Sequence, residues 1–214
     1  MKFKLAIFDL DGTLMDTSSG IFATANKAVE LVGRKPEYDK AQLSKFIGPP
    51  IDQCFINTYN LEEELIAEAV EHYRKEYHVR GQFGAKEYPS IKQTLQRLKE
   101  KGYLLAVGTL KTESLALSMM DHFGFAPYFA SIRGGDHVAK LSKADIVKKV
   151  LADLGVDPSE AVLIGDTVHD EEGAKEANVS FIAVDYGFGF PRGQEKTESM
   201  MAVVSSPEEL LSLL

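Results

Sequence analysis

Apolar and polar residues follow two different patterns in two parts of the chain. Near the N-terminus, residues 5–8 form a short continuous apolar run, which is typical of a strand buried on both faces of a parallel sheet. From residue 90 onward, amphipathic helical segments alternate with short apolar strands. This alternation predicts an α/β fold, with a Rossmann-like parallel sheet core covered by helices on both faces.

The expected elements of this alternating part follow from periodicity and from capping and turn residues. The predicted helices are 90–101, 112–123, 142–154 and 171–177, and the predicted strands are 104–107, 129–133, 161–164, 181–184 and 202–204, with a glycine-rich loop at 186–193.

Between the first strand and the alternating part, the apolar spacing is helical. The expected helices are 21–31, 42–46, 51–59 and 61–79, with a break at Gly48-Pro49-Pro50 and a return hinge at Gly81 to Gly84. These roughly 70 residues are far too many for a loop in a compact domain. We therefore expect an inserted all-helical domain over residues 15–86, and a core formed by residues 1–14 and 87–214.

Reactive side chains follow three of the predicted strands. Asp9 and Asp11 come after the first strand, Thr109 after strand 104–107, and Asp166 with Asp170 after strand 161–164. In open α/β sheets, ligands bind outside the carboxyl ends of the strands. Side chains two apart in an extended chain face the same way, and two carboxylates aimed together are costly unless a cation or a shared proton lies between them.

These residue types favour phosphoryl transfer. A carboxylate can act as a nucleophile through an aspartyl-phosphate, and carboxylate oxygens are the hard ligands that Mg²⁺ prefers. Unit charges about 4 Å apart interact by about 4 kcal/mol at an effective dielectric constant near 20, so an acidic cluster would repel a phosphate without a cation. The Thr109 hydroxyl and nearby backbone N–H groups suit phosphate oxygens.

Composition narrows the class of partner and the compartment. The chain has 214 residues, 44% of them hydrophobic, and a net charge of -8 from 24 basic and 32 acidic residues. With no basic run, we expect no binding to a nucleic acid polymer. The first apolar run is too short for a signal peptide, no run approaches a membrane span, and Cys54 is the single cysteine. We expect a cytoplasmic protein with no membrane association.

The motifs Asp9-Leu10-Asp11-Gly12-Thr13, Thr109, a downstream lysine and Gly165-Asp166-x-x-x-Asp170 resemble the haloacid dehalogenase superfamily of Mg²⁺-dependent phosphatases. The helical insert is similar to the family's C1-type cap. The segments Ile47 to Pro50, Tyr73-Arg74 and Tyr186 to Gly189 resemble the phosphoglycolate phosphatase and 5′-nucleotidase-like branch.

This resemblance implies a role for each motif residue. Asp9 would be the nucleophile, and Asp11 the general acid and base. Mg²⁺ would be held by Asp9, the backbone carbonyl of Asp11, and Asp166, with Asp170 supporting the site. Thr109, Leu110 and a lysine would bind the phosphate; Leu110 replaces a residue that is polar in many relatives.

Two lysines could supply the cation of the site. Lys143 follows the expected N-cap Ser142 and so lies in the first helical turn. The helix dipole makes a cation there unfavourable by roughly 0.3–1 kcal/mol, unless an anionic partner offsets this cost. Lys140 lies in the preceding loop. The resemblance favours Lys143, because the family's lysine typically stands three residues before an aliphatic pair, here Ile146-Val147.

The expected activity is hydrolysis of a small phosphorylated metabolite. A sugar phosphomutase of the same superfamily and, from another class, a phospho-accepting regulatory module remain alternatives. The sequence leaves open the substrate, the choice between monomer and homodimer, and whether Arg74 or the Gly48 to Pro50 loop contacts the substrate.

Overall fold

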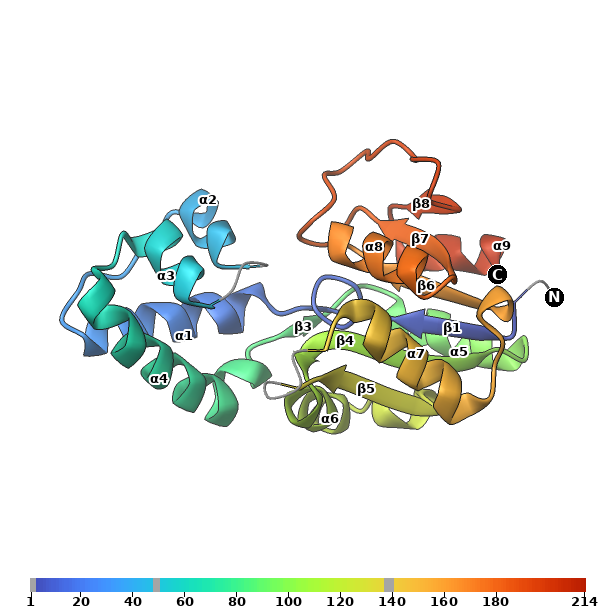
Figure 1. The fold of residues 1–214 in the computed structure, drawn as a ribbon, viewed down its shortest axis with the longest axis horizontal. Helices are drawn as coiled ribbons and strands as arrows, with labels where there is room; N and C mark the ends of the chain where they lie inside the picture. The colour runs from blue at the N-terminus through green and yellow to red at the C-terminus, as the bar shows by residue number, and fades with distance from the viewer. Residues whose placement is uncertain (1–2, 48–50, 137–140) are drawn as a thin grey trace. The chain divides into compact units, whose positions relative to one another are not determined.

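The computed structural model describes residues 3–47, 51–136 and 141–214 (Figure 1). It divides into two compact units, one formed by Met1–Asp16 and Glu87–Leu214 and the other by Thr17–Lys86. Two short strands, β2 (Met15–Asp16) and β3 (Lys86–Glu87), pair where the chain passes from one unit to the other.

A six-stranded sheet forms the centre of the first unit, in the order β5-β4-β1-β6-β7-β8. The strands are β1 (Leu5–Phe8), β4 (Leu104–Thr112), β5 (Ser131–Gly135), β6 (Ala161–Gly165), β7 (Ser180–Val184) and β8 (Ala202–Val204). Each of these neighbouring pairs is parallel. The first strand is therefore central, and all four of its residues are buried, as its uninterrupted apolar sequence predicts.

Helices cover this sheet on both faces, which confirms the predicted α/β, Rossmann-like fold. They are α5 (Ile91–Glu100), α6 (Glu113–His122), α7 (Lys143–Leu154), α8 (Val168–Glu176) and the short C-terminal α9 (Leu210–Leu213). Leu5, Ile7 and Leu163 pack in one apolar cluster with residues of α7 and α8. Figure 1 shows α5 on the opposite side of β1.

Strand β4 is longer than its apolar run predicts. The expected strand ended at residue 107, whereas β4 continues to Thr112. Its pairing with β5 resumes at Thr112 and Gly135 after a shift in register beyond Gly108. The extension depends on the neighbouring strand and not on hydrophobicity, so Thr109 lies within the strand and not after it.

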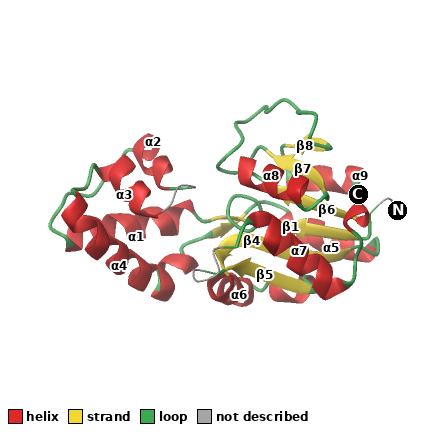
Figure 2. Ribbon diagram, in the orientation of Figure 1, coloured by secondary structure: helices red, strands yellow, loops and turns green. Residues whose placement is uncertain are grey.

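The second unit consists of helices and loops over residues 17–85, among the residues described (Figure 2). Its helices are α1 (Ser18–Leu31), α2 (Lys40–Leu43), α3 (Ile51–Tyr59) and α4 (Glu63–Val79). Rings of Phe46, Phe55 and Tyr73 pack together, and Tyr73 stacks on Tyr77 with 5.4 Å between ring centroids. This aromatic cluster forms the apolar interior of the unit.

Short 3₁₀ helices complete the secondary structure. They are η1 (Ser44–Phe46), η2 (Gly81–Phe83), η3 (Ala126–Tyr128), η4 (Pro158–Glu160) and η5 (Pro207–Glu209).

Candidate active site

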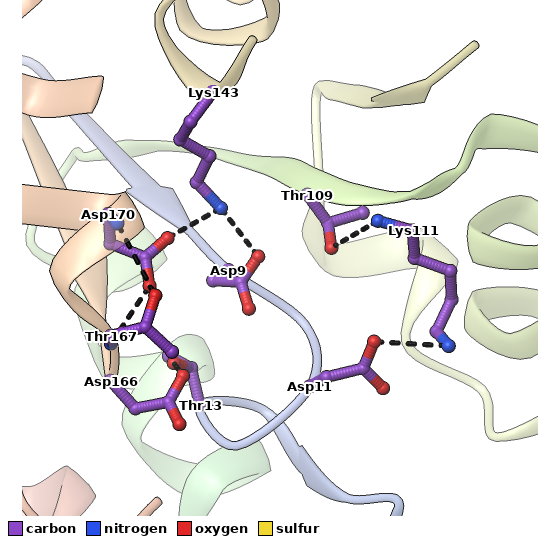
Figure 3. A network of polar contacts seen from close by, with 9 residues as sticks. All are labelled: Asp9, Asp11, Thr13, Thr109, Lys111, Lys143, Asp166, Thr167 and Asp170. Atoms are coloured by element: carbon purple, nitrogen blue, oxygen red, sulfur yellow. Dashed lines mark hydrogen bonds and ion pairs between the residues drawn. The ribbon is translucent and has the colours of Figure 1, made fainter. Parts of the chain in front are cut away.

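The ends of three adjacent strands bring the candidate residues together. Asp9 follows β1, Asp166 follows β6, and Thr109 lies near the end of β4, and these strands are neighbours in the sheet. All three side chains are buried. The sequence predicts that these residues lie at one edge of the sheet, and they lie there in the structure (Figure 3).

Lys143 connects two of the carboxylates. Its Nζ lies 2.5 Å from Asp9 Oδ1 and 2.6 Å from Asp170 Oδ1. The side chain of Lys143 is only 3% exposed, so its charge is compensated inside the protein. Burial lowers the pKa of Lys143, but the charges of Asp170 and Asp9 outweigh burial and raise it above its ordinary value. Lys143 therefore carries its positive charge next to Asp9.

The position of Lys143 follows from the start of α7. Ser142 caps this helix: its hydroxyl accepts a hydrogen bond from the Asp145 N–H, and the Asp145 carboxylate accepts one from the Ser142 N–H. Lys143 is consequently the first helical residue, where the helix dipole disfavours a cation. Asp9 and Asp170 provide the anionic partners that such a placement requires. The alternative, Lys140, lies outside the described residues.

Three buried aspartates form a cluster suited to a cation. Asp9, Asp166 and Asp170 each offer one carboxylate oxygen, and these oxygens lie within 4.8 Å of one another. Burial, and then the charge of Asp9, raises the pKa of Asp166 to about 7. Burial likewise raises the pKa of Asp9 to about 6, with Lys143 opposing this shift. The crowding of these carboxylates thus favours their protonated forms, unless a metal cation binds in place of the protons.

The surroundings of Asp166 are shaped to hold its side chain. A Cβ atom added at Gly12 would lie 2.1 Å from Asp166 Oδ2, so only glycine allows this approach. Asp166 Oδ2 accepts hydrogen bonds from the N–H groups of Phe188 and Gly189, at 2.7 and 3.3 Å. The Thr13 hydroxyl donates to Oδ1 at 3.4 Å. Hard oxygen donors on a fixed backbone fit a divalent cation such as Mg²⁺.

Asp170 has a structural contact in addition to Lys143. Its Oδ2 accepts hydrogen bonds from the N–H and the hydroxyl of Thr167, at 3.0 and 2.7 Å, and these contacts cap α8. Asp170 therefore lies inside the helix, whose start is Val168 and not residue 171 as predicted. Since both oxygens already have partners, the geometry favours a supporting position for Asp170.

The structure adds Lys111, which sequence analysis missed. Its Nζ lies 3.0 Å from Asp11 Oδ2, and Figure 3 shows Asp11 turned toward it. Lys111 follows Thr109 by two positions on β4, in the stretch where the pairing with β5 changes register. The backbone N–H of Lys111 also donates to the Thr109 hydroxyl at 3.3 Å. This lysine would have been a candidate if the strand had been predicted to its true length, which ends at Thr112.

Other candidate residues take no part in these contacts. Leu110 alternates with Thr109 and Lys111 and is 46% exposed. Arg74 is exposed on α4, where Glu71 pairs with Lys75 at 2.5 Å. His169 is exposed on α8. The Gly48 to Pro50 loop lies outside the described residues.

A parallel sheet that carries a buried lysine and several aspartates at its strand ends is typical of α/β proteins that transfer phosphoryl groups. Comparisons with known proteins identify the family. A model of the haloacid dehalogenase-like hydrolases matches residues 6–184. The chain therefore belongs to the haloacid dehalogenase-like hydrolases.

Individual relatives agree with this membership. A 5′-nucleotidase of Pseudomonas aeruginosa is 35% identical over 190 residues, which cover 88% of this chain and 86% of the relative. A phosphoglycolate phosphatase of Aquifex aeolicus is 33% identical over 186 residues, or 86% of each chain. The structure of a haloacid dehalogenase-like hydrolase from Streptococcus pneumoniae superimposes with a TM-score of 0.88 at 31% identity, covering 99% of this chain and 98% of that one. The protein is a phosphoric monoester hydrolase.

None of the helices in the described part of the chain combines the length and the apolar character that a membrane span requires.

Proposed function

We propose that this phosphatase hydrolyses small phosphomonoesters through a phosphorylated Asp9, with Mg²⁺ as its cation. The observation that carries the proposal is the contact of Asp9 with Lys143 inside a cluster of buried aspartates. Asp9 and Asp166, with the backbone carbonyl of Asp11, would hold the ion. When bound, Mg²⁺ would neutralise charge on the transferring phosphoryl group.

The chain's own residues would divide the chemistry. Asp9 attacks the phosphorus atom, and the ester bond to the leaving oxygen breaks as Asp11 donates a proton to that oxygen. Asp11 then accepts a proton from the water that attacks the phosphorylated Asp9. Lys143 and Thr109, with the backbone at Leu110, would bind the phosphate oxygens during both steps.

The names of the relatives suggest the substrate class. The two relatives are a 5′-nucleotidase and a phosphoglycolate phosphatase. We propose a small phosphorylated metabolite as the substrate, in a cytoplasmic protein, with the helical unit acting as a cap that selects among substrates. A phosphate-release screen across 5′-nucleotides, 2-phosphoglycolate, sugar phosphates and pyrophosphate tests this class.

The essential test uses the nucleophile and the cation. Asp9→Asn and, separately, an excess of chelator should each abolish phosphate release, because the attacking oxygen or the neutralising charge is lost. Restoration by Mg²⁺ after chelation should return the activity. Full activity in Asp9→Asn or without divalent cations would contradict the proposal. Asp52→Asn, which changes an exposed carboxylate on α3, serves as the control for the loss of one negative charge.

A further inference from the structure

Lys111 is a second lysine of the candidate active site, and its side chain is largely buried. Its side chain is 8% exposed, and its Nζ lies 3.0 Å from Asp11 Oδ2 (Figure 3). Asp11 is 25% exposed. Water therefore reaches this ion pair from the Asp11 side, whereas the lysine side is largely shielded. Ordering a long lysine side chain costs rotamer entropy, and the contact with Asp11 offsets part of this cost.

The two oxygens of the Asp11 carboxylate have different surroundings. Oδ2 contacts Lys111, whereas Oδ1 is buried and has no hydrogen-bond partner among the described residues. A buried carboxylate oxygen without a partner is costly in a folded protein. Such an atom is available to a proton that moves to and from a bound substrate. The contact with Lys111 thus leaves one defined oxygen for proton transfer.

The two lysines also contact different carboxylates. Lys143 contacts Asp9 and Asp170, and Lys111 contacts Asp11. Thr109 and Lys111 both lie on β4, and the N–H of Lys111 donates to the Thr109 hydroxyl. The same strand therefore supports both the expected phosphate-binding hydroxyl and the expected acid and base.

We propose that Lys111 is a positioning residue that acts through Asp11: it holds Oδ2 and so directs Oδ1 toward the leaving oxygen. This inference rests on the proposed function, in which Asp11 transfers the proton. In the first step, Oδ1 gives its proton to the leaving oxygen as the phosphorus–oxygen ester bond breaks. The carboxylate that results pairs with the Lys111 ammonium group, and Oδ1 later accepts a proton from the attacking water.

Leaving-group dependence separates this role from direct phosphate binding. The substrates are 4-nitrophenyl phosphate, whose nitrophenolate leaves with little need of a proton, and the alkyl phosphomonoester that is hydrolysed best in the screen. The measured quantity is kcat/KM, which includes breakage of the ester bond but not the later hydrolysis of the phosphorylated aspartate. The variants are Lys111→Met, Asp11→Asn and the double variant.

We expect Asp11→Asn to lower kcat/KM for the alkyl substrate by about 10²-fold or more, with a much smaller loss for 4-nitrophenyl phosphate. Lys111→Met should lower the alkyl value by at least about tenfold, with the same substrate preference. If Lys111 acts through Asp11, the double variant should stay within about threefold of Asp11→Asn.

Equal losses on both substrates, or losses that multiply in the double variant, would overturn the inference and make Lys111 an independent phosphate contact. A nearly normal Lys111→Met would overturn it too. An Asp11→Asn variant without leaving-group dependence would overturn the assignment of Asp11 and the inference together, whereas failure of Lys111 alone leaves the proposed function standing.

Two further variants keep the test decisive. Lys111→Gln removes the positive charge and shortens the side chain by one atom, and it replaces Lys111→Met, with the same expected losses, if circular dichroism shows that Lys111→Met is unfolded. Lys92→Met is the matched control. Lys92 is a partly buried lysine on α5 that pairs with Glu87 at 2.6 Å and with the Phe123 carbonyl at 2.7 Å, and we expect no substrate-dependent loss.

Discussion

At the scale of single residues, the site is a set of buried charges that compensate one another. Lys143 lies between Asp9 and Asp170, and Lys111 contacts Asp11. Removing one member of a buried pair leaves the other charge without compensation, which is far more costly than losing a surface ion pair. Substitutions here should therefore affect both stability and activity, and each needs a folding control.

Lys143→Met should lower kcat/KM by at least about tenfold, or about 1.4 kcal/mol of transition-state stabilisation. The reason is the loss of the cation next to Asp9, where the phosphoryl group would bind. Steady-state kinetics with folding checked by circular dichroism measures the effect. Lys148→Met, an exposed lysine on the same helix, is the control.

The same experiment on Lys140→Met should show little change. A larger loss in Lys140→Met than in Lys143→Met would move the cation's role to Lys140. If both variants keep nearly normal activity, neither lysine takes part in the mechanism.

At the scale of elements, helix starts and one loop orient the functional side chains. The capping residues Ser142 and Thr167 begin α7 and α8, so that Lys143 and Asp170 fall in the first turns of these helices. The loop after β7 turns its backbone N–H groups toward Asp166. Helix caps and this loop thus orient side chains that the sheet brings together from distant parts of the sequence.

Thr167→Ala should destabilise the protein by roughly 1 kcal/mol, the usual cost of losing an N-cap side chain. The Thr167 hydroxyl accepts from the Asp170 N–H and donates to Asp170 Oδ2, so both contacts disappear. Urea unfolding followed by circular dichroism measures the change. Thr167→Ser keeps the hydroxyl and should remain close to the original protein; equal losses in both variants would show that the methyl group matters instead.

Gly187→Ala should weaken binding of Mg²⁺. A Cβ atom at this position would lie 2.4 Å from both Asp166 Cβ and the Gly12 carbonyl oxygen, so the loop or Asp166 must shift. Isothermal titration calorimetry with Mg²⁺ measures the dissociation constant directly and does not depend on turnover. Phe188→Ala, which keeps the N–H that donates to Asp166, is the control. Unchanged affinity in Gly187→Ala would show that the fit around Asp166 is not needed for the ion.

At the scale of the whole molecule, the buried carboxylates couple folding to pH and to the cation. Burial raises the pKa of Asp9 to about 6 and of Asp166 to about 7. Between about pH 4 and pH 7 the ion-free folded protein therefore binds more protons than the unfolded chain, and this contribution to stability falls as pH rises. A bound cation replaces those protons and removes the penalty.

Mg²⁺ should consequently raise the Tm more at about pH 8 than at about pH 5, because at the lower pH the ion must displace protons from the carboxylates. Differential scanning calorimetry with Mg²⁺ or with chelator at the two pH values measures this difference. In Asp166→Asn the rise in Tm caused by Mg²⁺ should be much smaller at both pH values. An equal or larger stabilisation at about pH 5 would contradict the linkage between the ion and these carboxylates.

The sequence alone predicted the features that depend on local pattern. The uninterrupted apolar run at residues 5–8 indicated a strand buried on both faces of a parallel sheet, and the alternation after residue 90 indicated the α/β fold, which the structure and the structural comparison confirm. The motifs at Asp9 and Asp166 pointed to the haloacid dehalogenase family, which the family model confirms. Capping types and glycines located helix ends to within a few residues, because these signals depend on nearby backbone groups.

Only the tertiary structure decided which charges meet. The contact between Lys143 and Asp9 joins residues 134 positions apart, and no local pattern specifies it. The length of β4, and with it the direction of Lys111, depends on pairing with β5 in a shifted register. The physical reason is that strand pairing and burial of charge are set by neighbours distant in sequence, whereas periodicity and capping are set by adjacent residues.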